Sequence, residues 1–139
     1  MREYKFRGLS VEELVGDDQW VVGFGVNFVE LADGGIEAYL YSSTHGAYEV
    51  VPESVGQYTG LKDKNGVEIY EGDILGAPGN LSDELDYIGY VMWDEESARF
   101  ETECKDTRFA FIPNEEVEVI GNVWEDGELL NDSQIPKAD

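Results

Sequence analysis

The spacing of the apolar residues constrains this chain more than any other feature. Short runs that alternate polar and apolar residues, or that are rich in β-branched and aromatic residues, recur between Gly, Asn, Asp and Pro. Such runs are typical of β-strands, and the three- and four-residue spacing of a helix is scarce. The sequence therefore predicts a mainly β fold. We expect strands at residues 20–29, 36–41, 47–51, 73–76, 87–93, 99–103, 108–112 and 117–123.

Helices are predicted only as short turns. Ser10 and Glu13 have the spacing of a capping box, which predicts a helix at residues 11–15. Pro52 suits the first position of a second helical turn, and a third is expected near residues 82–85. Residues that favour turns connect the predicted strands at Asp33-Gly34-Gly35, Lys64-Asn65-Gly66, Pro78-Gly79-Asn80 and Pro113-Asn114.

The charge of the chain is strongly one-sided. Its 139 residues include 31 acids and 9 bases, which gives a formal net charge of −22. Such a protein repels phosphate backbones and anionic lipid heads, so we expect no direct binding to nucleic acid or to a membrane surface. Acidity of this kind commonly serves solubility alone. The alternative is a DNA-mimic inhibitor, whose carboxylates occupy the groove of a host nucleic-acid-binding protein, and composition does not separate the two.

Cysteine content and the terminal segments bear on location. Cys104 is the only cysteine, which excludes an internal disulfide and gives no sign of an oxidising compartment. The first residues lack the apolar stretch of a signal peptide, and no segment approaches the roughly 20 apolar residues of a membrane span. We therefore expect a cytoplasmic protein.

The sequence contains no catalytic signature. His45 is the only histidine, so a zinc site of the usual Cys/His type is excluded. Residues 63–68 lack the spacing of a calcium loop, because Gly66 is fourth rather than sixth. Pairs such as Glu71 and Asp73 arise by chance among so many acids. We expect no catalytic residue, no metal and no cofactor, and an enzyme that uses carboxylates or a metal on a small molecule or nucleotide is the least favoured alternative.

The C-terminal half has the glycine spacing of small SH3-like barrels. Gly-Asp-Ile at residues 72–74 opens a strand, a long loop follows, and a Gly-x-Val strand begins at Gly89. Glycine permits sharp strand bending in such barrels, and alternate residues such as Val91 and Trp93 face the core. This half therefore predicts an SH3-like β-barrel.

Five segments of the chain follow a pattern that extends over nearly its whole length. They are Tyr4-Lys-Phe-Arg-Gly8, Trp20-Val-Val-Gly-Phe24, residues 50–74 with Gly56-Gln-Tyr-Thr-Gly-Leu-Lys-Asp-Lys-Asn-Gly66 at their centre, Gly89-Tyr-Val-Met-Trp93 and Val119-Ile-Gly-Asn-Val-Trp-Glu125 through residues 128–130. In these segments the sequence resembles the YopX family, small proteins of uncharacterised function found in bacteriophages and prophages. Two departures are Ser54, where the family usually has Thr, and Asp126-Gly127, where Asn-Pro is more typical.

The resemblance implies a phage or prophage origin, homo-oligomerisation and no reaction. We expect one domain over residues 1–139, with a β-rich part at 1–60, an SH3-like part at about 67–130 and a frayed tail at 131–139. The expected function is a non-enzymatic, self-associating interaction module with a strongly acidic surface, whose other partner is a basic host or phage protein. If polar positions of the family pattern bind a ligand, we expect them to be Gln57, Tyr58, Thr59, Asp63, Glu71 and Asp73.

Overall fold

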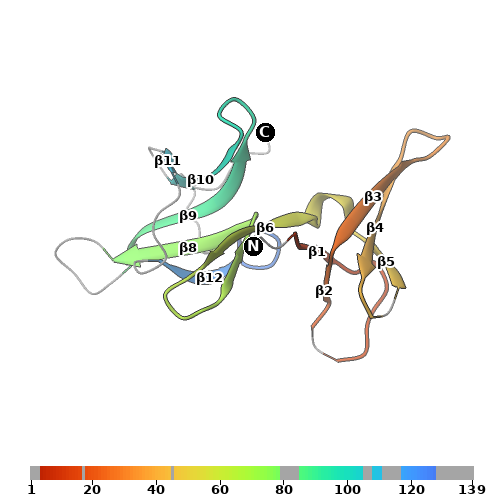
Figure 1. Cartoon of the computed structure of the whole chain (residues 1–139), viewed down its shortest axis with the longest axis horizontal. Helices are drawn as coiled ribbons and strands as arrows, with labels where there is room; N and C mark the ends of the chain where they lie inside the picture. The colour runs from red at the N-terminus through yellow and green to blue at the C-terminus, as the bar shows by residue number, and fades with distance from the viewer. Residues whose placement is uncertain are drawn as a thin grey trace. The chain divides into compact units, whose positions relative to one another are not determined.

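The computed structural model describes residues 4–16, 18–44, 46–78, 85–104, 108–110 and 117–127. Strands dominate these residues, and the only helix among them is one three-residue 3₁₀ turn, so the predicted mainly β fold is confirmed. The chain divides into two compact units, unit 1 at residues 1–58 and unit 2 at residues 59–139 (Figure 1). The single domain expected over residues 1–139 stays a prediction.

Unit 1 is built from two groups of antiparallel strands. Strand β1 pairs on one side with β2 and on the other with Gly56 and Gln57 at the start of β6. A separate three-stranded meander has the order β3-β4-β5. The strands are β1 (Phe6–Leu9), β2 (Trp20–Gly23), β3 (Gly25–Glu30), β4 (Ile36–Ser42), β5 (Gly46–Val50) and β6 (Gly56–Lys62).

The core of unit 1 follows the two-residue period of its strands. Ala38 and Leu40 lie on the same face of β4, and Val50 lies directly opposite Ala38 on β5. All three are fully buried, and Val21 of β2 packs with them. Each buried apolar side chain the size of Val or Leu stabilises the fold by about 1.5–3 kcal/mol.

The single strand predicted at residues 20–29 is in fact two strands, and Gly23 explains the break. A Cβ atom at Gly23 would lie 2.2 Å from the carbonyl oxygen of Tyr41, so the backbones approach more closely than any side chain allows. The N–H of Phe24 donates to that same carbonyl at 3.0 Å. The chain therefore leaves the pairing of β2 at Gly23 and enters β3 at Gly25.

Unit 2 contains the rest of β6, the short strand β7 and a five-stranded antiparallel sheet of order β11-β10-β9-β8-β12 (Figure 1). Ile69, Leu75, Val91 and Val117 form its core, and Phe100 packs against them. In the described part of unit 2, the edge strands β11 and β12 are not paired, so the SH3-like barrel stays a prediction. The new strands are β7 (Glu68–Tyr70), β8 (Asp73–Pro78), β9 (Leu85–Asp94), β10 (Arg99–Cys104), β11 (Arg108–Ala110) and β12 (Glu118–Asn122).

The helix predicted at residues 11–15 is wrong. The Ser10 hydroxyl donates to the carbonyl of Glu12 at 2.6 Å instead of capping a helix, and the N–H of Leu14 donates to the side chain of Gln19 at 2.7 Å. The turn predicted at Pro52 is confirmed as the 3₁₀ helix η1 (Pro52–Ser54). The third predicted turn lies outside the described residues, except that Leu85 begins β9.

Two of the predicted turns are confirmed. In the β3–β4 hairpin Gly34 has a φ of +91°, and the N–H of Leu31 donates to the carbonyl of Gly35 at 2.7 Å. Gly66 has a φ of +82° between β6 and β7. His45, the tail at 131–139 and the turn residues 79, 80, 113 and 114 lie outside the described residues. No helix in the described ranges is long and apolar enough to cross a membrane.

Candidate functional site

Asp63 holds the turn between β6 and β7. It is almost fully buried, at 3% exposure. One carboxylate oxygen accepts the N–H groups of Asn65 at 2.8 Å and Val67 at 2.9 Å, and the other accepts the N–H of Val119 at 2.9 Å. The same side chain therefore closes its own hairpin and joins it to β12, 56 residues later in the chain.

The surroundings of Asp63 favour its charged form. Burial raises the pKa of the carboxyl group, but the hydrogen bonds from Val119, Val67 and Asn65 lower it by more, and the net pKa is lowered from 3.8. Hydrogen bonds made to the charged form of a carboxylate have this effect. Because its oxygens accept three backbone N–H groups, Asp63 acts as a structural clamp in this turn, and its role as a ligand-binding residue stays a prediction.

Glu71 and Asp73 belong to the next turn, between β7 and β8. Gly72 has a φ of +92°, a conformation that favours glycine. Asp73 is buried at 2% exposure and accepts the N–H of Tyr70 at 2.7 Å. The N–H of Gly72 donates to the carbonyl of Val91, and the carbonyl of Gly72 accepts the N–H of Val123, each at 2.9 Å. The backbone of Gly72 therefore joins this turn to the rest of unit 2, and the Asp73 carboxylate closes the turn itself.

The other three predicted site residues are also used structurally. The Thr59 hydroxyl donates to the carbonyl of Ile69 at 2.8 Å across the β6–β7 hairpin. In unit 1, Tyr58 is buried, and the ammonium group of Lys5 lies 5.0 Å from its ring centroid, a cation–π contact. Gln57 is half-buried and lies opposite Phe6 of β1. Gln57, Tyr58 and Thr59 are consecutive residues of β6, and of the six predicted site residues only Thr59 lines a pocket described below.

A further clamp lies after β12, and none of the predicted site residues belongs to it. Asn122 is buried, and its side-chain oxygen accepts the N–H groups of Trp124 at 3.0 Å and Glu125 at 2.9 Å. Asp126 accepts the N–H of Asn122 at 3.1 Å, and a Cβ at Gly121 would lie 2.7 Å from the Asp126 side chain. The local signal that could have indicated this clamp is the Gly121-Asn122 pair within the family-like segment.

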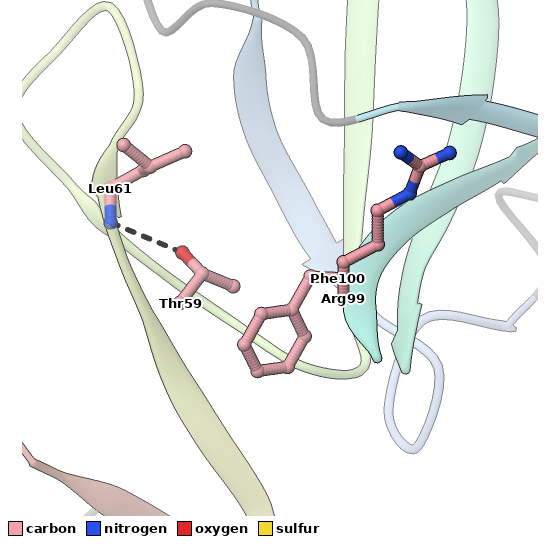
Figure 2. Close-up of a pocket in the computed structure, with 4 residues that line it drawn as sticks. All are labelled: Thr59, Leu61, Arg99 and Phe100. Atoms are coloured by element: carbon pink, nitrogen blue, oxygen red, sulfur yellow. Dashed lines mark hydrogen bonds between the residues drawn. The ribbon is translucent and has the colours of Figure 1, made fainter. Parts of the chain in front are cut away.

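Unit 2 has a small open pocket of about 230 Å³, lined by Thr59, Leu61, Arg99 and Phe100. Figure 2 shows Thr59 and Leu61 on one side and Phe100 and Arg99 on the other, with the guanidinium group directed away from the Phe100 ring. Arg99 Nε donates to the buried carboxylate of Glu101 at 2.8 Å. Most small-molecule sites have about 300–1,000 Å³, and this pocket is smaller.

Unit 1 has a larger pocket of about 390 Å³, which we call the Tyr39 pocket. Its lining residues come from β4, from β5 and from the segment beside β5, and they are Ser10, Glu12, Tyr39, Ala47, Tyr48 and Glu49. The Tyr39 hydroxyl donates to Glu37 at 2.8 Å. That hydrogen bond, followed by desolvation and the charges of Glu37 and Glu49, raises the pKa of Tyr39, so the phenol stays neutral at physiological pH.

No group of three or more His, Cys, Asp or Glu residues within the described ranges is arranged to hold a metal ion. The acids of the turn motifs bond to backbone N–H groups instead.

The family of this chain follows from its match to a family model. The family model described as "YopX protein" matches residues 19–131, which is most of the sequence. The chain belongs to the YopX family. All six predicted site residues of this YopX protein lie within the matched span, and the Tyr4–Gly8 segment precedes it.

This YopX protein is also similar to a solved structure, described as the crystal structure of protein EF1440 from Enterococcus faecalis. The two are 25% identical, with a TM-score of 0.52, and the match covers 94% of this chain and 99% of the other. A search of curated proteins finds no match. The central stretch of the YopX pattern, residues 56–66, contains the Asp63 clamp, and the descriptions of the matching family and structure name no reaction.

Proposed function

We propose that this YopX protein is a non-enzymatic interaction module that associates with itself and binds a basic protein through its acidic surface. The observation that carries the proposal is a pair of exposed apolar side chains on the β3–β4 hairpin. Phe28 is 52% exposed and Ile36 is 56% exposed. We call these two residues the hairpin patch.

The two side chains of the hairpin patch lie on the same face of the meander as its buried core residues, but outside the buried region. Phe28 lies opposite Ala38, and Ala38 is fully buried on that face. Ile36 lies two residues before Ala38 on the same strand, so it points to the same side. Strand β3 is an edge of the meander in the described residues, and exposed apolar edge strands favour pairing with another chain.

The distribution of charge supports unit 1 as the self-associating part. Unit 1 has 10 acids and 3 bases, a net charge of −7, and unit 2 has 21 acids and 6 bases, a net charge of −15. Two copies that meet through unit 1 therefore repel each other less than two copies that meet through unit 2. Salt screens this repulsion, with a screening length of about 8 Å at physiological ionic strength.

The test is sedimentation equilibrium as a function of protein and salt concentration. We expect self-association that strengthens as salt rises, and a Phe28→Ser, Ile36→Ser double variant that is at least tenfold weaker. Val67→Ser is the matched control, because Val67 is 48% exposed but belongs to the β6–β7 turn. A monomer at all concentrations, or equal weakening by the control, would contradict the proposal.

The charge of unit 2 supports the second part of the proposal. With Asp63 and Asp73 used as clamps, exposed acids such as Glu95 and Glu96 in the β9–β10 turn remain for long-range attraction. Binding to a basic protein should weaken as salt rises, opposite to self-association. A pull-down from nuclease-treated bacterial lysate, eluted by a salt gradient, tests for such a partner, and retention of no basic protein would count against it.

The proposal also includes three expectations from the sequence: closure of unit 2 as an SH3-like barrel, a phage or prophage origin and a cytoplasmic location. The barrel has the clearest test, because closure requires backbone pairing between the two edge strands of the sheet. Amide contacts between β11 and β12 in an NMR spectrum would establish it, and their absence would leave an open sheet.

A further inference from the structure

The Tyr39 pocket combines the groups that proteins use to hold an organic cation. Its volume of about 390 Å³ lies within the usual range of about 300–1,000 Å³ for ligand sites. Tyr39 supplies an aromatic ring, and Glu12 and Glu49 supply two carboxylates. Aromatic faces attract cations because their π-systems carry negative charge, and a carboxylate beside them adds a direct ionic contact.

The geometry of β4 and β5 places these groups together. Tyr39 lies directly opposite Glu49 in the antiparallel register, so the ring and the carboxylate emerge side by side. Residues 9–11 run along the other edge of β5, where Val11 N–H donates to the Glu49 carbonyl at 3.0 Å, and this brings Glu12 to the pocket. The Tyr39 hydroxyl is held by Glu37 at 2.8 Å, which restricts the ring.

Both carboxylates lack a cationic partner in the part of the chain that the structure describes. Among the described residues, neither Glu12 nor Glu49 is joined to a cationic side chain, whereas Glu101 and Glu118 are joined to Arg99 and Lys64. A partly enclosed pocket that holds two unneutralised carboxylates attracts a cation and repels an anion. The net charge of −22 acts in the same direction.

We propose that the Tyr39 pocket receives a Lys or Arg side chain of the basic partner protein. The inference rests on the proposed function and deepens it, because it names the contact that would fix the orientation of a partner attracted over a longer range by the whole acidic surface. The alkyl part of such a side chain would pack on the Tyr39 ring, and its charged end would meet Glu12 and Glu49.

The test uses short capped peptides and the full chain. Titration with acetyl-Gly-Lys-Gly-amide or acetyl-Gly-Arg-Gly-amide, followed by ¹⁵N NMR, is expected to shift the amides of residues 38–40 and 47–49. The matching Glu peptide is expected to cause no shift there. Shifts spread evenly over both units, or no shift at all, would overturn the proposal.

Charge-matched variants separate a specific site from general acidity. Glu12→Gln with Glu49→Gln is expected to weaken binding of the Lys peptide at least fivefold at physiological salt. Glu95→Gln with Glu96→Gln removes the same charge from the β9–β10 turn and is expected to change binding less than twofold. Equal weakening by the two double variants would show a general charge effect and would overturn the proposal that the Tyr39 pocket binds the cation.

The aromatic contribution has its own comparison. Tyr39→Phe keeps the ring and is expected to retain binding within twofold, and Tyr39→Leu is expected to weaken it at least threefold. If Tyr39→Leu fails to fold by circular dichroism, the Gln variants carry the test. Self-association measured on the same variants is expected to be unchanged. Failure of the Tyr39-pocket proposal and failure of the self-association proposal therefore give different results.

Discussion

The two units use their acidic residues in different ways. In unit 2, Asp63 and Asp73 are buried and accept backbone N–H groups, so their charges stabilise turns. In unit 1, Glu12 and Glu49 line a pocket and meet no internal cation among the described residues. A carboxylate count alone therefore says little about function, because the same residue type fastens the backbone in one unit and lines a pocket in the other.

The largest expected effect tests the clamp in unit 2. Asp63→Ala leaves three N–H groups without their acceptor, those of Asn65, Val67 and Val119. A buried unsatisfied donor costs about 1–3 kcal/mol, so we expect a loss of about 3 kcal/mol or more in the free energy of unfolding. Hydrogen exchange should show the loss at Val91 in unit 2 and little change at Leu40 in unit 1. Equal loss in both units would mean that they unfold together.

Gly23→Ala is the corresponding change in unit 1. The added Cβ would lie 2.2 Å from the Tyr41 carbonyl oxygen, and β2 or β4 must move. Overpacking of this kind costs about 1–3 kcal/mol, and we expect about 2–3 kcal/mol here. Protection at Leu40 should fall more than protection at Val91. Gly25→Ala is a suitable control, since nothing lies within 4 Å of the position that its added methyl group would occupy.

A smaller effect follows from the lowered pKa of Asp63. A carboxylate with a folded pKa below its unfolded value of 3.8 stabilises the fold above that value, and the stabilisation is lost as pH falls through the folded pKa. The stability difference between the native protein and Asp63→Asn should thus be constant near neutral pH and shrink below about pH 4. Chemical denaturation at several pH values measures it. A difference that grows in acid would contradict the lowered pKa.

The smallest stability change is expected at the hairpin patch. Phe28 is already half exposed, so Phe28→Ser should alter the free energy of unfolding of the monomer by less than about 1 kcal/mol. Its effect on self-association should be much larger. Denaturation at a protein concentration too low for association isolates the monomer. A large loss there would show that Phe28 supports the core of unit 1 and would weaken the proposal.

Local signals in the sequence predicted local structure well. Alternation predicted β4 nearly to the residue, and Asn65-Gly66 predicted the turn between β6 and β7. The capping-box signal at Ser10 failed because the backbone of this segment pairs elsewhere. Val11 N–H donates to Glu49, and the Leu9 carbonyl accepts from Val51, so residues 9–11 run extended beside β5. Tertiary pairing overrode a weak helical preference.

The candidate sites were less predictable because their partners are distant in sequence. Asp63 was named from the family pattern, but its bond to Val119 spans 56 residues and leaves no local signal. The Tyr39 pocket draws on three segments, and only the register of β4 and β5 brings Tyr39 to Glu49. Pairings of this kind depend on the assembled fold and not on the spacing of residues within one strand.

The hydrogen bond between Asp63 and Val119 also affects the order in which parts of the chain fold during translation. Every partner in the β1, β2 and β6 pairing of unit 1 has been synthesised by Gln57. The β6–β7 hairpin, although complete at Tyr70, lacks its third N–H donor until residue 119 emerges. At about 5–20 residues per second, ribosomal synthesis leaves a delay of a few seconds between the two. During that interval the strands of the first unit have all of their pairing partners, whereas the β6–β7 hairpin lacks its bond to β12.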